Sequence, residues 1–491
     1  MTQCRVIAMS FLPTLHATVA RQPDATAIFY RNERISYADL QARWLSAADY
    51  LRAKGVREGM RVGITLTQSP DYCVFALALA QLGAVTLNLS PALAAAERRD
   101  LCERFAVDLL VSCWPGLEDA GLPCIALTEQ IHSRVGAISP TAFPPPAAQA
   151  PFRILLTSGT TDAPAGVVQT YEAASLRMTR MSAPFEADTC LLASDLNIAS
   201  SLIPVLGTLC AGGRVVFATE YSAEDVVNVM ERFAVTRLMM VPVQAAGLAH
   251  YLAGRQQTLP ALKHVCLVGA TPAPPVTDLL RAKLTPNVHV VYGVTEIGVI
   301  ALATAAELVG KPACVGRVAP WARIEVVDGA GVPLPPNEVG TVRVAVDGMI
   351  ADYVGEPQAR TSRFEGGWFY PGDLGWIDAA GYLFIDGRQD DVLNVGGNKV
   401  RPEMVESVLR GFPGVTDVAV FVDRTVRGDS QLVAAYVSPE IIDVKDIGPY
   451  ALERLGWLAP QCYMRVDELP RTESGKLQRR KLHGSLIKHG V

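Results

Sequence analysis

The chain has 491 residues, half of them hydrophobic, and carries a formal net charge of −5. This length exceeds what one hydrophobic core usually serves, so we expect at least two domains. The slight acidic excess argues against a nucleic-acid-binding protein, the apolar fraction excludes overall disorder, and the longest apolar run, Cys73–Ala80, is too short to span a bilayer.

Cysteine usage and the first residues bear on the cellular compartment. The ten cysteines are scattered and form no CxxC motif, which is typical of reduced core thiols in a cytoplasmic protein. The apolar stretch Val6–Leu15 resembles a weak export signal, but Pro13 interrupts it. We therefore expect this stretch to continue as a helix, and we predict a cytoplasmic location.

Two blocks of the chain alternate short apolar runs with longer amphipathic ones. In the first, strands Ala27–Tyr30 and Val62–Leu66 alternate with helices Tyr37–Lys54 and Pro70–Leu82. The strands expected in the second block are Leu191–Ala193, Arg214–Phe217, Arg237–Val241, His264–Val268 and His289–Tyr292. This rhythm predicts an α/β fold of mostly parallel sheets covered by helices. The Pro- and Ala-rich segment Ser139–Pro151 is predicted to be a surface linker.

The pattern changes after residue 312. Short strands separated by turns are expected at Ile324–Asp328, Gly340–Val346, Gly367–Tyr370 and Tyr382–Asp386, which indicates a β-barrel-like subdomain. Beyond residue 390, a helix Pro402–Arg410 with proline in its first turn precedes strands Val415–Val422 and Gln431–Val437. This last part is predicted to be a small α+β domain.

A loop rich in hydroxyl side chains and glycine follows the expected strand Arg153–Leu156. Its sequence, Thr157–Gly166, reads TSGTTDAPAG, and such a loop can surround phosphate oxygens with backbone N–H and hydroxyl groups. The glycine spacing fits neither the Walker A loop nor GxGxxG. Alone the loop is weak evidence, because most such stretches are ordinary surface turns.

Four further motifs follow in order: YGVTE at 292–296, GDL at 372–374, GRQDD at 387–391 and PRTESGK at 470–476. Together with the loop, they resemble the adenylate-forming superfamily of acyl-CoA synthetases, stand-alone and nonribosomal-peptide adenylation enzymes, and firefly luciferase. The resemblance runs from about residue 35 to residue 476. It implies a large N-terminal adenylation domain, 1–389, and a small mobile C-terminal domain, 390–491.

The resemblance also implies a nucleotide site for ATP and Mg²⁺. The residues implied around the phosphates are Thr157, Ser158, Gly159, Thr160, Thr161 and Gly166. Those implied around the adenine are Gly269, Ala270, Tyr292 and Gly293. Thr295 would hydrogen-bond the α-phosphate, and Glu296 would bind Mg²⁺, a cation that prefers oxygen ligands. Asp373 would accept both ribose hydroxyls, with Arg388 supporting ribose or phosphate.

The implied reaction has two steps: ATP converts a carboxylic acid to acyl-AMP, and a phosphopantetheine thiol of CoA or a carrier protein then displaces AMP. Lys476 would bridge the substrate carboxylate and the α-phosphate in the first step. The C-terminal domain would then rotate about Asp390, and Gly396 and Gly397 would line a pantetheine tunnel. In isolation, Asp373 and Lys476 would be ordinary turn or loop residues.

The phosphate loop departs from the family pattern Gly-x-Pro-Lys-Gly. Asp162 stands where the first glycine is normal and Ala165 where the lysine is, so the loop loses a cation and gains a carboxylate. Weaker ATP binding, a substituting cation, or an adenylate-binding relative without turnover would each explain this change. The intact Glu296, Asp373 and Lys476 argue against loss of activity.

The implied acyl pocket lacks a clear partner for a substrate ammonium group. Its candidate residues are Asn197, Ile198, Leu202, Val268, Val294 and Val299. An apolar wall cannot compensate a buried ammonium group, which favours a non-amino, apolar acyl or aryl acid. A shifted alignment would instead bring Asp195 or Asn197 to the ammonium position, and the chain would then be an amino-acid adenylation enzyme.

The residues after 470 are basic, with Arg471, Lys476, Arg479, Arg480, Lys481 and Lys488 against one acid, Glu473. A solvated helix face explains such a tail. Contact with CoA phosphates or with an acidic carrier protein is the alternative.

Overall fold

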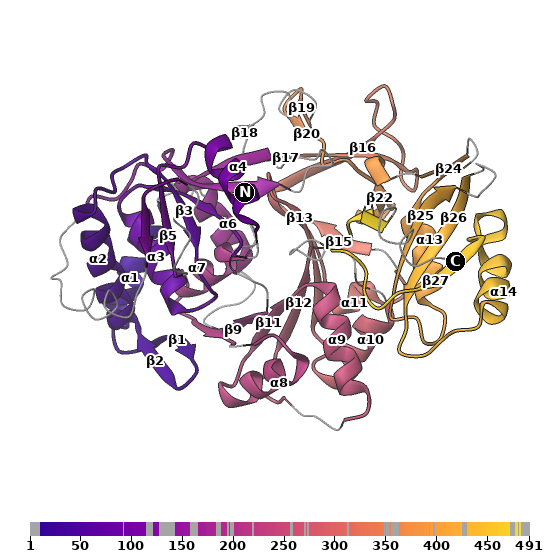
Figure 1. Cartoon of the computed structure of the whole chain (residues 1–491), viewed down its shortest axis with the longest axis horizontal. Helices are drawn as coiled ribbons and strands as arrows, with labels where there is room; N and C mark the ends of the chain where they lie inside the picture. Colours follow the sequence, from indigo (N-terminus) through magenta and orange to yellow (C-terminus); the bar gives the residue numbers. More distant parts are fainter. Residues whose placement is uncertain are drawn as a thin grey trace.

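The computed structural model describes most of the chain. The described residues are 10–91, 93–113, 121–126, 143–157, 165–182, 188–193, 196, 201–218, 220–255, 259–269, 272, 274–311, 314–347, 349, 353–354, 363–391, 393–395, 398–424, 430–471, 477–479 and 481–482. Figure 1 shows three regions along the molecule: an N-terminal α/β region, a central sheet with its helices, and a small C-terminal unit.

The first sheet has seven strands in the order β18-β8-β7-β4-β3-β5-β6. These strands are β3 (Arg61–Thr65), β4 (Val85–Asn88), β5 (Leu109–Ser112), β6 (Cys124–Ala126), β7 (Pro151–Thr157), β8 (Ala165–Thr170) and β18 (Tyr353–Val354). The central pairs are parallel, whereas β8 runs antiparallel to both of its neighbours, β7 and β18. The predicted linker is therefore a connection within one sheet: residues 143–150 lie outside helices and strands and lead directly into β7.

The second sheet has fifteen strands. It contains both the strands predicted to alternate with helices and the short strands predicted after residue 312. Its parallel part comprises β1 (Thr26–Tyr30), β9 (Thr189–Leu192), β10 (Arg214–Phe217), β11 (Arg237–Met240), β12 (His264–Val268) and β13 (Val288–Val294). Its antiparallel part comprises β2 (Glu33–Ser36), β14 (Gly298–Ala303), β15 (Cys314–Val318), β16 (Ala322–Val327), β17 (Gly340–Val346), β19 (Phe364–Glu365), β20 (Trp368–Phe369), β21 (Asp373–Ile377) and β22 (Tyr382–Arg388). The α/β class is thus confirmed, with mixed sheets.

One detail differs from the sequence-based expectation. The first expected strand belongs to the first block along the chain, yet β1 pairs with β10 of the second sheet, with Ile28 opposite Val215. An apolar strand such as β1 can pack against helices in either sheet, so hydrophobic periodicity alone does not predict which sheet the strand joins.

The helices cover both sheets (Figure 1). They are α1 (Phe11–Arg21), α2 (Tyr37–Ala53), α3 (Pro70–Gln81), α4 (Ala95–Arg104), α6 (Tyr171–Ser182), α7 (Leu202–Cys210), α8 (Ala223–Arg232), α9 (Pro242–Ala253), α10 (Pro274–Lys283) and α11 (Ala305–Leu308). Two further helices, α13 (Pro402–Arg410) and α14 (Val444–Leu455), belong to the small C-terminal unit. Helix α2 begins with a capping box, in which the Ser36 side chain accepts from the Asp39 N–H and Asp39 accepts from Ser36. Helix α3 begins at Pro70 and is buried at every position except Asp71, which accounts for the apolar run Cys73–Ala80. No helix in the described part of the chain is long and apolar enough to cross a membrane.

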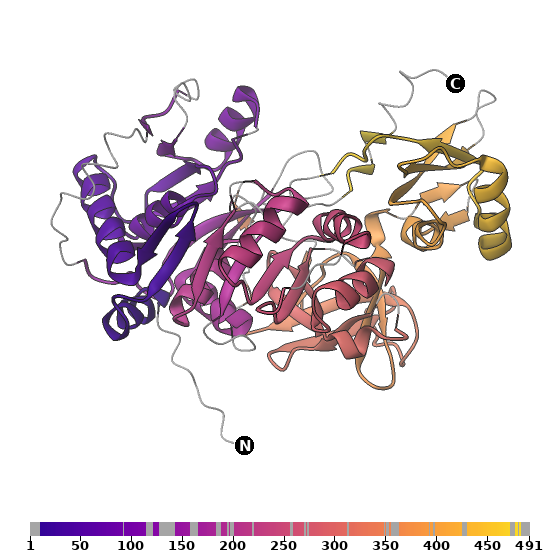
Figure 2. The same ribbon diagram turned by 90° about the horizontal axis from the view of Figure 1, so that it is seen from below.

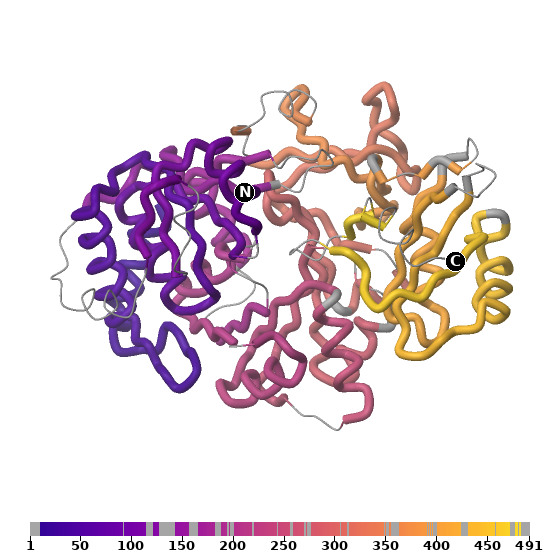
Figure 3. Tube along the Cα trace, in the orientation of Figure 1, coloured from indigo at the N-terminus to yellow at the C-terminus, as the bar shows by residue number. Residues whose placement is uncertain are grey.

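The chain leaves the second sheet at Arg388 and builds a separate unit. A short 3-10 helix, η2 (Gln389–Asp391), leads to strands β23 (Leu393–Val395), β24 (Asn398–Val400), β25 (Asp417–Arg424), β26 (Ser430–Val437) and β27 (Cys462–Arg465), with η3 (Gly456–Leu458) before the last strand. The hydrophobic clusters of this unit contain no described residue before Leu393. Figures 2 and 3 show the chain running from β22 into this unit, which lies to one side of the body.

Candidate active site

A buried carboxylate lies at one end of the β21–β22 hairpin. Asp373 is the first residue of β21 and pairs across the ladder with Arg388, the last residue of β22. The Arg388 guanidinium donates to Asp373 Oδ1 at 3.1 Å, and the hydroxyl of Tyr292, on β13, donates to Oδ2 at 2.5 Å. Asp373 is only 5% exposed. Tyr292 and Arg388 therefore meet at the Asp373 carboxylate, and the three residues come from three separate sequence motifs.

The electrostatics of this cluster fix the role of Tyr292. Burial and the neighbouring Asp373 charge raise the pKa of the Tyr292 phenol well above 10, so the hydroxyl stays protonated and acts as a donor. A carboxylate offers about four acceptor positions, of which Tyr292 and Arg388 each use one. The Asp373 oxygens can therefore still accept two hydroxyl groups from a sugar.

A second carboxylate lies in the turn between β13 and β14. Glu296 is 4% exposed, and its Oε1 accepts a hydrogen bond from the Tyr353 hydroxyl at 2.8 Å. Tyr353 comes from β18, an edge strand of the first sheet, so this contact joins that edge to a turn between two interior strands of the second sheet. Burial, together with the contact with the Glu296 charge, raises the pKa of Tyr353.

The backbone of the same turn is held by an arginine from helix α6. Arg177 donates from Nη1 to the Thr295 carbonyl at 2.9 Å and from Nη2 to the Glu296 carbonyl at 2.6 Å. Burial, and then the charge of Arg153, lowers the pKa of Arg177 to about 9, so the guanidinium remains charged at neutral pH. The turn is therefore attached to the helix by two charge-assisted hydrogen bonds.

Glycines permit the close packing around this turn. A Cβ at Gly293 would lie 2.3 Å from the Gly298 carbonyl oxygen, a distance that side chains do not tolerate. Gly298 has a φ of +89°, and a Cβ there would lie 3.2 Å from the Arg177 side chain. The glycine in the YGVTE motif thus has a packing reason besides any contact with adenine.

The turn also offers oxygen atoms suited to a hard cation. The Glu296 carboxylate and the Thr295 hydroxyl are adjacent along the chain, and Mg²⁺ is usually held by one or two carboxylates together with substrate phosphates. The described residues contain no cluster of three or more His, Cys, Asp or Glu side chains that could hold a metal by themselves. The donor set fits a metal that arrives with a nucleotide.

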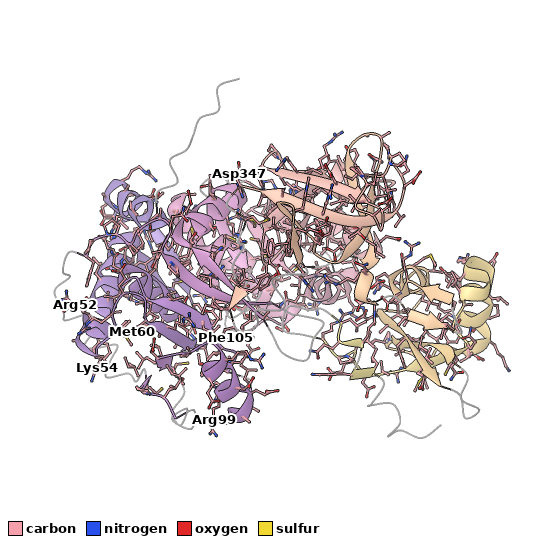
Figure 4. All side chains as sticks on the ribbon, turned by 90° about the horizontal axis from the view of Figure 1, so that it is seen from above. Arg52, Lys54, Met60, Arg99, Phe105 and Asp347 are labelled. Carbon is pink, nitrogen blue, oxygen red and sulfur yellow. The ribbon has the colours of Figure 1, made fainter. Side chains whose placement is uncertain are left out.

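The phosphate loop connects β7 and β8, and residues 158–164 lie outside the described part of the chain. Thr157 ends β7 and pairs with Ala165, the first residue of β8. A Cβ at Gly166 would lie 2.5 Å from the ring of Phe105, which follows α4 and is labelled in Figure 4, and 2.8 Å from Ile154. Gly166 is therefore required by packing beneath the loop, whatever its role toward phosphate.

The candidate acyl-pocket residues occupy different surroundings. Val268, Val294 and Val299 are half-buried at the ends of β12 and β13 and the beginning of β14, the same end of the sheet as the Glu296 turn. Leu202 is 1% exposed at the start of α7 and packs into the largest hydrophobic core. Gly269, after β12, has a φ of +95°. Asn197, Ile198 and Ala270 lie outside the described residues.

The candidate hinge, tunnel and lysine belong to the C-terminal part of the chain. Asp390 lies in η2, directly after β22. Gly396, Gly397 and Lys476 are outside the described part of the structure. After them, Arg479 is mostly buried and donates to Glu403 at 2.8 Å and to Glu406 at 2.6 Å. Arg479 therefore anchors the basic tail to α13 instead of facing solvent.

Sequence reasoning missed Arg177 and Tyr353. Tyr353 belongs to a two-residue strand without any motif, so no sequence signal points to it. Arg177 stands four residues after Ala173 and four before Met181, on the apolar stripe of its helix. A charged residue on such a stripe indicates a buried ion with a specific task, and this signal could have identified it.

Comparisons with known proteins identify the family to which this chain is similar along most of its length. The family model of the AMP-binding enzyme matches residues 15–354, and the model of the AMP-binding enzyme C-terminal domain matches residues 404–476. The chain is 29% identical over 476 residues to a feruloyl-CoA synthase of Amycolatopsis sp, covering 93% of this chain and 94% of that protein. It is 27% identical over 500 residues to a 4-chlorobenzoate–CoA ligase of Arthrobacter sp, covering 96% and 94%.

The fold is also that of a solved structure. The o-succinylbenzoate CoA synthetase of Bacillus subtilis, in complex with its acyl-adenylate intermediate, superimposes with a TM-score of 0.85 at 24% identity. The match covers 96% of this chain and 97% of that one. The same synthetase is also known in complex with ATP and a magnesium ion.

Proposed function

Because the chain belongs to the family of AMP-binding enzymes, we propose that it activates a carboxylic acid with ATP and transfers the acyl group to the thiol of CoA. The observation that carries this proposal is the meeting of Tyr292 and Arg388 at the buried Asp373 carboxylate. That carboxylate keeps acceptor capacity for a ribose, and a second one, Glu296, lies in the turn that follows the Tyr292 strand.

In the first step, an oxygen of the substrate carboxylate attacks the α-phosphorus of ATP, and pyrophosphate leaves. Asp373 accepts the ribose hydroxyls, Tyr292 lies against the adenine, and the Thr295 hydroxyl donates to the α-phosphate. Glu296 would hold Mg²⁺, which would supply positive charge for the phosphate oxygens. Lys476 stabilises the charge that develops between the carboxylate and the phosphate.

In the second step, the thiolate sulfur attacks the acyl carbonyl carbon, a thioester forms, and AMP leaves with the electron pair of the broken bond. We assign the body of the enzyme to residues 1–389 and the mobile unit to 390–491, with Asp390 as the hinge. Two observations support this division: the large sheet ends at Arg388, and the later hydrophobic clusters are made of later residues alone. Gly396 and Gly397 would allow close approach of pantetheine.

The proposed acid is apolar, acyl or aryl, and carries no amino group. Val268, Val294 and Val299 are half-buried near the Glu296 turn, and none of them can compensate an ammonium charge. The names of the relatives, a feruloyl-CoA synthase and a 4-chlorobenzoate–CoA ligase, denote enzymes for aromatic acids and support an aryl substrate. CoA is the proposed acceptor, with carrier-protein phosphopantetheine as the alternative.

We also propose that the enzyme works in the cytoplasm, where ATP and CoA are present and thiols stay reduced. Nine cysteines of the described residues are free, and several are buried in the core. Burial raises the pKa of the Cys73 thiol to about 12, as expected for an inert core residue.

One assay tests the proposal directly. Purified enzyme is incubated with ATP, Mg²⁺, CoA and a panel of benzoates, cinnamates, fatty acids and amino acids, and AMP and thioester are measured. We expect AMP and acyl-CoA in equal amounts with an aryl or apolar acid. AMP release with amino acids alone would contradict the substrate class, and thioester formation only with a holo-carrier protein would contradict the CoA acceptor. No AMP with any acid of a broad panel would contradict the function.

A further inference from the structure

The charge of Arg177 is buried and forms no ion pair with any residue in the described part of the chain. The residue is 7% exposed, and its two terminal nitrogens donate to backbone carbonyls, those of Thr295 and Glu296. Among the described residues, its Nε has no hydrogen-bond partner. Burying a cation in this way costs free energy, and the nearby charge of Arg153 adds to the cost. The Glu296 charge offsets part of it, so further negative charge near the turn would stabilise the arrangement.

The position of this cation suggests what compensates it. Arg177 lies under the turn that carries Thr295 and Glu296, the two residues proposed to contact the α-phosphate and Mg²⁺. The phosphate loop of this chain has Ala165 where the family pattern has a lysine, so one cation normally near the phosphates is missing. A polyphosphate bound at this turn would bring negative charge close to Arg177.

We propose that Arg177 is a positioning residue for nucleotide activation, which fixes the Thr295–Glu296 turn and adds positive charge beneath it. The inference rests on the function proposed above and deepens it. The planar guanidinium holds two successive carbonyls at once, so the backbone that carries the Thr295 hydroxyl and the Glu296 carboxylate is fixed before ATP and Mg²⁺ bind. Arg177 itself does not need to touch the substrate.

A neighbouring arginine provides a matched control. Arg180 lies one turn later on α6 and donates to the Asp347 carbonyl at 3.1 Å, with its guanidinium over the Trp321 ring at 5.6 Å. It therefore attaches the same helix to the same part of the protein through contacts other than the Thr295–Glu296 turn. Arg177→Met and Arg180→Met remove equal charge and similar packing, whereas Arg177→Lys keeps the charge but loses the planar fork.

Two measurements test the role. The first is ATP–pyrophosphate exchange as a function of Mg²⁺ concentration, and the second is the rise in melting temperature on addition of Mg–ATP without acid. Losing a residue that supports a metal ligand typically costs 10- to 100-fold in metal affinity or activity, so Arg177→Met should raise the half-saturating Mg²⁺ concentration at least about 10-fold. It should also reduce the Mg–ATP-induced thermal shift. Arg177→Lys should fall between Arg177→Met and wild type.

The outcomes separate this role from a structural one and from failure of the proposed function. Arg180→Met should lower the melting temperature of the free enzyme yet leave the Mg²⁺ requirement within about 2-fold. An unchanged Mg²⁺ requirement and thermal shift in Arg177→Met would overturn the inference. If that variant does not fold, an unchanged Mg²⁺ requirement in Arg177→Lys would overturn it instead. A wild-type enzyme that shows no pyrophosphate exchange with any acid would contradict the proposed function. An active wild type whose Arg177 variants keep the wild-type Mg²⁺ requirement and thermal shift would contradict only the role of Arg177.

Discussion

Replacing Asp373 by asparagine keeps the shape of the side chain and removes the charge that Tyr292 and Arg388 contact. Hydrogen bonds to a charged group contribute about 1.5–3 kcal/mol, and neutral ones about 0.5–1.5 kcal/mol. Asparagine has one acceptor oxygen, so with that oxygen toward Arg388 the Tyr292 hydroxyl must accept from the new amide N–H instead of donating. With each of the two contacts weakened by about 1 kcal/mol, the free energy of unfolding should fall by about 2 kcal/mol. The Arg388 side chain is 28% exposed, so solvent screens part of its share and this figure is an upper value.

The same substitution should affect ATP more than the acid. If two ribose hydroxyls bind the Asp373 carboxylate, each bond also weakens by about 1 kcal/mol, which raises the KM for ATP on the order of 30-fold. The assay is pyrophosphate exchange with ATP and acid varied separately, and the KM for the acid should stay near the wild-type value. Urea unfolding gives the stability change in the same preparation.

A matched substitution at the other end of the hairpin serves as the control. Asp378 caps the β21–β22 turn and pairs with Lys311 at 3.3 Å, far along both strands from Asp373. Asp378→Asn should lower stability without changing the KM for ATP. A wild-type KM for ATP in Asp373→Asn, or an equal rise in both variants, would refute the assignment of Asp373 to the ribose.

Three further outcomes are expected. Lys476→Ala should abolish pyrophosphate exchange while thioester formation from synthetic acyl-AMP persists; exchange at the wild-type rate would contradict its role. Burial and the neighbouring histidine lower the pKa of His289 from 6.5 to about 4. Between these two pH values the unfolded state binds a proton that the folded state does not, so the free energy of unfolding decreases as the pH falls from 6.5 to 4. His289→Gln should flatten this loss in urea unfolding, and an unchanged pH slope would count against it. Gly293→Ala, whose Cβ would meet the Gly298 carbonyl, should destabilise the protein by roughly 1–3 kcal/mol. Gly247→Ala, in α9 with open space around it, should stabilise it by about 0.5–1 kcal/mol. Melting temperatures that change in the same direction in the two variants would contradict both expectations.

Local sequence patterns predicted most elements because each signal acts over a few residues. The predicted helix Pro402–Arg410 has the same bounds in the structure, and strand Arg214–Phe217 is also unchanged. The partner of a strand is a different matter, because it depends on contacts between distant residues. The pairing of β1 with β10 and the insertion of β18 beside β8 both join segments more than 180 residues apart, and periodicity carries no information about such pairings.

The residues of the candidate site also fall into those that the sequence identifies and those that it does not. Tyr292, Asp373 and Arg388 lie in short motifs that the family resemblance identifies, and the structure brings these three together. Arg177 contacts the Glu296 turn through two hydrogen bonds and Tyr353 through one, and both come from elements that have no motif. The helical pattern of α6 marks Arg177 as buried but does not say what it contacts, and the two-residue strand β18 carries no local signal.

The position of Arg388 limits how this enzyme can be recombined with its relatives. Arg388 closes the Asp373 cluster, and the 3-10 helix that leads to the C-terminal unit begins at the next residue. A chimera that exchanges this unit should therefore be joined after Arg388, because an earlier junction divides the proposed nucleotide site between two parents. Gly387 sets a second limit, because a Cβ there would lie 2.7 Å from the Glu403 side chain of α13. A C-terminal unit taken from a relative with a large residue at position 403 therefore fits only an N-terminal part that keeps glycine at position 387.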